Sequence, residues 1–181
     1  MSSSTILCDA PARATGLARF ADYWELTKPK IAVLELACVA VAALVAGSPS
    51  LGGLFATLLG IACVAASASA LNQWLERESD VLMRRTADRP LPRGSLSPRE
   101  VGLFGVVSLA IGLTTLVLLV NVVTALVSLA TWALYVCVYT PLKRRSVANT
   151  AVGAVAGAMP VLMGWTCQGK PFDLEAAALC V

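Results

Sequence analysis

Long apolar runs dominate the chain and predict helices that cross a membrane. Five runs approach the length of about 20 residues that a bilayer-spanning helix needs. They cover about 31–46, 51–75, 101–120, 122–139 and 147–165. A sixth run begins at Leu174 and continues to the last residue, Val181. The runs are continuous rather than alternating or one-sided, which favours lipid as their surroundings. We therefore predict an all-α, multi-pass transmembrane bundle, with a polar tail over 1–22 and a membrane domain over 23–181.

The composition agrees with this pattern and excludes several classes of protein. Of the 181 residues, 57% are hydrophobic and 14% are charged, which is more apolar side chain than a soluble domain of this size could bury. The chain has no histidine, which excludes histidine acid–base catalysis and histidine ligation of zinc or heme iron in this stretch. Its six cysteines form no C-x-x-C pair. We interpret them as small apolar residues rather than as a disulfide or zinc framework.

Basic residues gather in alternate connecting segments. All 14 Lys and Arg residues except Lys170 precede the first run, or lie between the second and third runs, or between the fourth and fifth. By the positive-inside rule, the N-terminus and both of these loops are cytoplasmic, which predicts a multi-pass protein of the inner (plasma) membrane. We interpret the positive charge as a topology signal first, so membrane lipid is an expected partner and nucleic acid is not.

The end of the second run carries the most informative polar residues. If the helix continues, Asn72, Glu76 and Asp80 follow one another at steps of about 40° and share one face, whereas Glu78 points elsewhere. An amide and two carboxylates at the membrane edge are suitable ligands for Mg²⁺. This ion prefers oxygen ligands and is usually held by one or two carboxylates together with substrate phosphates.

Four arginines follow this acidic stripe within one loop, at positions 84, 85, 89 and 93. Guanidinium groups bind phosphate oxygens in bidentate fashion, and the prolines and glycine of 90–94 stop a continuous helix, so we expect the loop to fold back. Carboxylates facing arginines predict a Mg²⁺–diphosphate site. The alternative is a set of ordinary surface ion pairs, which contribute little, and spacing alone does not separate these two interpretations.

Further candidate residues lie in the other runs. Tyr139 and Lys143 are close together after the fourth run, where a lysine can bind phosphate as a point charge or snorkel to the interface. Glu35, a carboxylate inside the first run, is a candidate pocket residue. Asn149, at the start of the fifth run, is another, although a hydrogen bond to a neighbouring helix suits it equally well. The GxxxG motif at 153–157 predicts close helix packing.

Together these segments resemble the heme O synthases (protoheme IX farnesyltransferases), a branch of the UbiA-type intramembrane prenyltransferases. The resemblance runs from about residue 20 to 180 and keeps the order of the motifs. The matching segments are Asp22–Lys30, Asn72–Asp80, Arg85–Pro98, Tyr139–Arg144 and the block 149–165. The wider UbiA-type proteins typically have Asp directly after the asparagine. Here Gln73 follows Asn72, and this departure, with the Arg-Thr-x-x-Arg-Pro-Leu sequence, favours the heme branch over the quinone and chlorophyll branches.

The resemblance implies a function as well as a fold. It implies about nine spans around a central cavity, and transfer of the farnesyl group of farnesyl diphosphate to heme B, with Mg²⁺, to make heme O. A downstream heme-modifying enzyme is then a candidate partner. By similarity, the expected ligands of Mg²⁺ and the diphosphate are Asn72, Glu76 and Asp80. The side chains expected to neutralise the phosphates are Arg85, Arg89, Lys143 and Arg144. Tyr139 is expected to position the leaving group or the allylic cation.

The chain ends before the second acidic motif that the family pattern carries after a later span. We therefore expect it to be the N-terminal part of a longer prenyltransferase, and to be inactive alone. Two alternatives stay open. One is a UbiA-type enzyme acting on a quinone precursor or chlorophyllide, and the other is a non-enzymatic membrane protein, such as a transporter half or an assembly factor. A transporter half should carry polar residues at mid-membrane, whereas the polar cluster here lies at the predicted cytoplasmic rim.

Overall fold

The computed structural model describes residues 16–143 and 146–179, and the elements within them are helices. In chain order they are α1 (Gly16–Leu26), α2 (Pro29–Ala46), α3 (Leu51–Asp80), α4 (Pro98–Leu119), α5 (Val122–Ala133), the π-helix η1 (Leu134–Tyr139), α6 (Thr140–Leu142), α7 (Asn149–Thr166) and α8 (Leu174–Leu179). This part of the chain contains no strand. The predicted all-α fold is confirmed.

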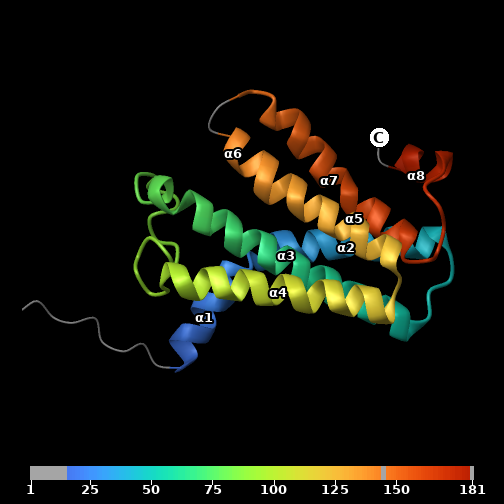
Figure 1. Ribbon diagram of the computed structural model, residues 1–181, viewed down its shortest axis with the longest axis horizontal. Coiled ribbons are helices and arrows are strands. Elements are labelled where there is room, and N and C mark those ends of the chain that lie inside the picture. Colours follow the sequence, from blue (N-terminus) through green and yellow to red (C-terminus); the bar gives the residue numbers. More distant parts are fainter. Residues whose placement is uncertain (1–15, 144–145, 180–181) are drawn as a thin grey trace, which may run out of the picture.

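The long helices lie side by side in one bundle (Figure 1). α3 packs mainly against α4, and α2 packs mainly against α7, while α5 contacts α3, α4 and α7. The start of α2, the 81–97 loop and the end of α6 lie at the same end of the bundle (Figure 1), which we call the charged end. The basic segments therefore share one end, as their alternation along the chain predicts.

Four helical segments of the described residues are long and apolar enough to cross a membrane. They are Pro29–Ala46, Leu51–Asp80, Pro98–Leu119 and Val122–Leu142. These match the first four predicted spans. α7 forms where the fifth span is predicted, but it carries polar residues at both ends, from Asn149 to Thr166, and is not among the four. The fifth span therefore stays a prediction, as does the sixth, of which α8 covers the start.

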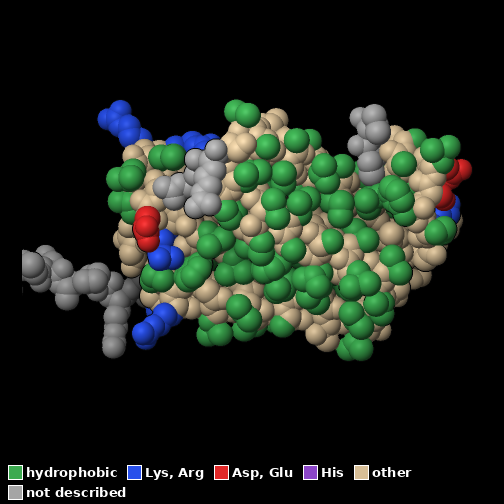
Figure 2. Space-filling view, turned by 45° about the horizontal axis from the view of Figure 1, so that its top comes forward, with side chains coloured by type: hydrophobic (Ala, Val, Ile, Leu, Met, Phe, Trp, Pro, Cys, Tyr) green, Lys and Arg blue, Asp and Glu red, His purple; other side chains and the backbone are tan. Residues whose placement is uncertain are grey.

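Apolar side chains cover the middle of the bundle, and charged side chains gather toward its ends (Figure 2). Leu103, Leu118 and Leu126 are exposed by 66%, 73% and 59%. A water-soluble protein rarely presents so much contiguous apolar surface. The exposed faces therefore fit a helical bundle whose surroundings are lipid.

Local signals explain where the long helices begin. The Ser50 side chain accepts a hydrogen bond from the Gly53 amide at the start of α3. Ser97 and Glu100 form a reciprocal capping box at the start of α4. These side chains satisfy amide groups that have no partner within the helix. The two loops therefore give way to helices where the sequence pattern predicts the second and third spans.

A helix crosses the predicted boundary of the N-terminal tail. α1 begins at Gly16, so the predicted boundary at residue 22 between a polar tail and the membrane domain falls inside a helix. Leu26 is fully buried, and Asp22 is only 5% exposed. Asp22 is buried because it forms an ion pair with Arg93 of the 81–97 loop. Polarity alone does not reveal such a distant partner, and the division into a tail and a membrane domain stays a prediction.

The closest helix packing of α7 involves a glycine outside the GxxxG motif. A Cβ atom at Gly164 would lie 2.3 Å from the Val39 carbonyl oxygen, so α7 and α2 approach backbone to backbone there. A Cβ at Gly157 would meet no heavy atom within 4 Å, and one at Gly153 would face the Tyr139 ring. Close packing at the motif is therefore found at Gly153, where a Cβ would lie 3.1 Å from Tyr139 Cε2 of η1, and not at Gly157; both glycines also line a cavity.

Candidate functional site

The acidic stripe forms at the charged end of α3, as helical geometry predicts. Asn72, Glu76 and Asp80 are 3%, 6% and 3% exposed, although they occupy the last three turns of a helix that ends at Asp80. The Glu78 side chain, by contrast, is 81% exposed and pairs with the neighbouring Arg77. One face of α3 therefore carries three buried oxygen-bearing side chains toward the inside of the bundle.

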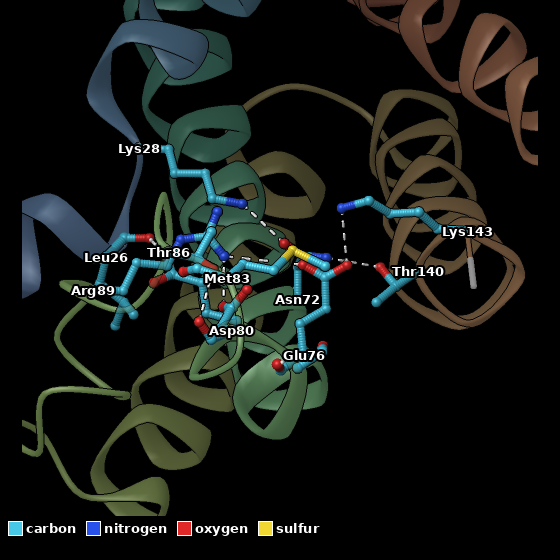
Figure 3. Close-up of polar contacts among 12 residues, drawn as sticks. Leu26, Lys28, Asn72, Glu76, Asp80, Met83, Thr86, Arg89, Thr140 and Lys143 are labelled. Carbon is cyan, nitrogen blue, oxygen red and sulfur yellow. Dashed lines mark hydrogen bonds and ion pairs between the residues drawn. The ribbon is translucent and has the colours of Figure 1, made fainter.

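Two cations from distant segments reach this stripe (Figure 3). Arg89 Nη1 lies 2.6 Å from Asp80 Oδ2 and 4.0 Å from Glu76 Oε2. Lys143 Nζ lies 3.1 Å from Glu76 Oε1. The carboxylate side chains are only 5% and 8% exposed, whereas the cations are 22% and 44% exposed. These are not the solvated surface pairs of the alternative interpretation, since burial removes the carboxylates from water.

Lys28 is a third cation of the cluster, and it is not among the site residues predicted from the sequence. Its Nζ donates to Asn72 Oδ1 at 2.9 Å, and Asn72 Nδ2 donates to Thr140 Oγ1 at 3.1 Å. Burial, and after it the nearby Arg89 guanidinium, lower the pKa of Lys28 to about 8. The sequence feature that could have revealed it is a lysine directly before Pro29, at the start of a membrane span.

Lys28 also has an unusual backbone conformation. Its φ of 51° places it in the left-handed region, as the only described residue other than glycine with a positive φ. This conformation is unfavourable for a residue with a Cβ atom and is commonest where the surrounding structure enforces it, often at functional sites. Here it lets the chain turn from α1 into α2 while the lysine side chain reaches Asn72.

The 81–97 loop folds back over the end of α3, as its prolines and glycine predict. Thr86 Oγ1 donates to the Asp80 carbonyl oxygen at 2.8 Å, and Gly94 adopts a φ of 78°. Leu91 and Leu96 are buried in an apolar cluster that the loop shares with Leu26 of α1, Ala70 of α3 and Val101 of α4. These contacts hold Arg89 against the acidic stripe.

Other predicted phosphate ligands lie elsewhere. Arg85 is exposed, and within the described residues it has no hydrogen bond or ion pair. Arg93, also in the loop, pairs with Asp22 and Glu25 of α1 rather than with the stripe. Arg144 lies outside the described residues. Of the predicted basic side chains, the structure therefore brings Arg89 and Lys143 to the carboxylates.

A cavity of about 360 Å³ lies between α2, α3, α5, η1 and α7, and Lys28 is the member of the cluster that lines it. Lys28 and Tyr139 line it near the polar cluster, and Tyr139 stacks on Tyr135 with ring centroids 5.4 Å apart. Most other lining groups are apolar. Glu35 lies in the cavity wall, whereas Asn149 does not line it. The cavity is therefore mostly apolar, with Lys28 and Glu35 as its charged lining residues.

The stripe offers oxygen atoms, which are the type of ligand that Mg²⁺ prefers. Two carboxylates and one amide oxygen converge on one face of α3, and Mg²⁺ commonly takes one or two carboxylates and completes its shell with water and substrate oxygens. No group of three or more His, Cys, Asp or Glu side chains within 16–143 and 146–179 is arranged to hold a metal by itself. The stripe thus resembles an open site rather than an all-protein metal cage.

Comparison with known proteins agrees with this geometry. Residues 34–181 match the sequence model of the UbiA prenyltransferase family. The chain belongs to the UbiA prenyltransferase family. Among curated members of this family, it is 44% identical over 161 residues to a protoheme IX farnesyltransferase of Symbiobacterium thermophilum, covering 87% of this chain and 54% of that protein. It is 40% identical over 171 residues to one of Anaeromyxobacter sp., covering 94% and 58%. The chain spans about half the length of the curated relatives it matches.

A solved structure of a UbiA homolog from Archaeoglobus fulgidus, bound to DMAPP and Mg²⁺, has the same fold. It superimposes with a TM-score of 0.77 at 24% sequence identity, over 88% of this chain and 59% of that chain. A second structure of an Archaeoglobus fulgidus UbiA homolog, bound to GPP and Mg²⁺, superimposes with a TM-score of 0.75. The helical arrangement described above is therefore that of part of a UbiA-type bundle.

Proposed function

We propose that the complete protein transfers the farnesyl group of farnesyl diphosphate to a vinyl group of heme B and so makes heme O, with Mg²⁺ as cofactor. The observation that carries this proposal is the buried cluster of carboxylates and cations, together with a mostly apolar cavity that Lys28 of the same cluster lines. The choice of heme B is supported by the curated relatives of 40–44% identity, which are named protoheme IX farnesyltransferases.

The proposed roles follow from the contacts of each side chain. Asn72, Glu76 and Asp80 would hold Mg²⁺ together with the diphosphate. Bound there, Mg²⁺ would neutralise charge on the phosphate oxygens and so make the diphosphate a better leaving group. Arg89 and Lys143 already lie at the carboxylates, from which they could turn toward a phosphate with little movement. We keep Arg85 and Arg144 as further candidate phosphate ligands that approach from the loops.

The cavity suits the allylic half of the reaction. The bond between the first farnesyl carbon and the diphosphate oxygen breaks, and both electrons leave with the diphosphate. A heme vinyl group then supplies the electrons of a new carbon–carbon bond. Water adds to the remaining cation and releases one proton, which completes a hydroxyethylfarnesyl group. Mostly apolar walls limit premature capture of the allylic cation by water, and the Tyr139 ring can stabilise that cation through its π face.

The site needs no protein nucleophile, in agreement with a chain that lacks histidine. Glu35 in the cavity wall is a candidate contact for the acceptor, and Asn149 remains a candidate at the rim of α7. We place the charged end on the cytoplasmic side of the plasma membrane, on the strength of the positive-inside rule. A heme-modifying enzyme that receives the product is a proposed partner.

The test is an acceptor panel in membranes that contain the complete protein. Farnesyl diphosphate and Mg²⁺ are supplied with heme B, with 4-hydroxybenzoate as a quinone precursor, or with chlorophyllide, and products are identified by mass. We expect heme O alone, and no product after Mg²⁺ is chelated. Farnesylation of either other acceptor would assign the protein to a different branch of the family. Absence of any product with all three would support the non-enzymatic alternative.

A further inference from the structure

The short helix α1 has an apolar face that the bundle does not cover. Leu17, Phe20 and Trp24 are 84%, 70% and 59% exposed. At 100° per residue these three side chains fall within an arc of about 60°. Asp22 and Leu26, which lie on the opposite side of the helix, are buried. α1 therefore points a narrow apolar stripe away from the protein.

The inner face of α1 is joined to the loop that carries Arg89. Leu26 packs in one cluster with Leu91 and Leu96 of the loop. Arg93 of the same loop pairs with Asp22 and also with Glu25, at 3.2 Å from Glu25 Oε2. Gln73 Nε2, next to the acidic stripe, donates to the Leu26 carbonyl oxygen at 2.9 Å. α1 is thus joined by several contacts to the 81–97 loop, and by this hydrogen bond to α3.

The position of α1 relative to the spans identifies what covers its outer face. Only Thr27 and Lys28 separate α1 from α2, which is long and apolar enough to cross a membrane. α1 also runs at a steep angle to the long helices at the charged end of the bundle (Figure 1). A helix in that place lies along the membrane surface, since the spans fix the membrane normal. Its apolar stripe includes a tryptophan, which favours the headgroup level.

We propose that α1 is an interfacial helix whose Leu17, Phe20 and Trp24 insert into the lipid headgroup layer. Through Asp22, Glu25 and Leu26, the membrane then holds the 81–97 loop, with Arg89, over the acidic stripe. The partner is the lipid surface, not a second copy of the chain or another protein. This inference does not depend on the identity of the prenyl acceptor.

The experiment places a photoreactive phenylalanine analogue at position 20, or at Ala18 as a control, in the complete protein. Ala18 is also exposed, but it lies about 160° around the helix from Phe20. The protein is reconstituted in phosphatidylethanolamine–phosphatidylglycerol vesicles, irradiated, and analysed by mass. We expect lipid adducts at position 20 and few or none at position 18. Adducts to a polypeptide at position 20, equal lipid adducts at both positions, or no lipid adduct at either would overturn the proposal.

A second measurement tests whether this contact holds the loop. Phe20→Glu should weaken insertion of α1 and so speed amide hydrogen exchange across 86–96, whereas Ala18→Glu should leave that exchange at the wild-type rate. The bundle helices serve as an internal control, because their exchange should change in neither variant. Unchanged exchange across 86–96 in Phe20→Glu would overturn the role of α1 as an anchor of the loop.

Discussion

Replacing Gly164 by alanine should loosen the contact between α2 and α7, whereas the same change at Gly157 should not. A Cβ at Gly164 would lie 2.3 Å from the Val39 carbonyl oxygen, 2.7 Å from Ala42 Cβ and 3.0 Å from the Ala43 amide nitrogen. Two of these atoms belong to the backbone, so no side chain can turn away to relieve the contact. Since ordinary carbon–oxygen contacts begin at about 3.3 Å, the helices must separate by about 1 Å.

The expected loss of stability follows from this separation. Overpacking of a well-packed interior typically costs about 1–3 kcal/mol, and a backbone contact belongs at the upper end of that range. Alanine also favours a helix over glycine by up to about 1 kcal/mol, and this gain applies at both positions. Gly157→Ala supplies the control for it, because a Cβ there meets no heavy atom within 4 Å. The difference between the variants therefore isolates the clash.

The assay is thermal stability of the purified protein in detergent, followed by loss of the monodisperse peak after heating. Gly164→Ala should lose that peak at a clearly lower temperature than the wild type, and Gly157→Ala at the same or a slightly higher temperature. Equal thermal stability of the two variants would refute the backbone contact. The reverse order would restore the close packing at Gly157 that the GxxxG motif predicts.

Three further predictions concern the site. Arg89→Gln should lower stability by about 2–4 kcal/mol and weaken Mg²⁺-dependent binding of farnesyl diphosphate, because it leaves Asp80 buried without its cation; Arg85→Gln, at an exposed position, should change stability little, and equal losses in the two variants would count against the assignment. Burial lowers the pKa of Lys28 from 10.5 to about 8, so between these values the unfolded chain binds more protons than the folded one. The free energy of unfolding should therefore rise with pH across this window. Lys28→Met should flatten that rise when unfolding is measured from pH 7 to 11, and an unchanged slope would show that other groups cause the pH dependence. Gly157→Phe should fill the cavity and raise the KM for farnesyl diphosphate while the protein still inserts, and an unchanged KM would show that the prenyl chain lies elsewhere.

The acidic stripe could be predicted from the sequence because it depends only on helical geometry. Asn72, Glu76 and Asp80 share a face whatever the helix packs against, provided that the helix continues to Asp80. The fold-back of the loop could also be predicted, since it rests on the local conformational limits of proline and glycine. Both features depend on residues close together in the chain.

Features that depend on long-range packing could not be predicted in this way. Lys28 reaches Asn72 across 44 positions of sequence, and Asp22 is buried only because Arg93 returns to it. The GxxxG motif was misleading at Gly157 for the same reason. Its glycines permit close approach, but whether a neighbouring helix is there is decided by the whole bundle, which places α2 at Gly164 instead.

Farnesyl transfer by variants of the acidic stripe tests the proposed site most directly. Glu76→Ala, Asp80→Ala and the control Glu78→Ala are compared with the wild-type complete protein, in membranes that contain equal amounts of each. Glu78 belongs to the same helix, but its side chain is 81% exposed and lies off the buried face. We predict that the first two substitutions abolish conversion of heme B to heme O while insertion remains intact, and that the control retains it. Wild-type turnover in both Glu76→Ala and Asp80→Ala would contradict the assignment of this stripe as the catalytic site.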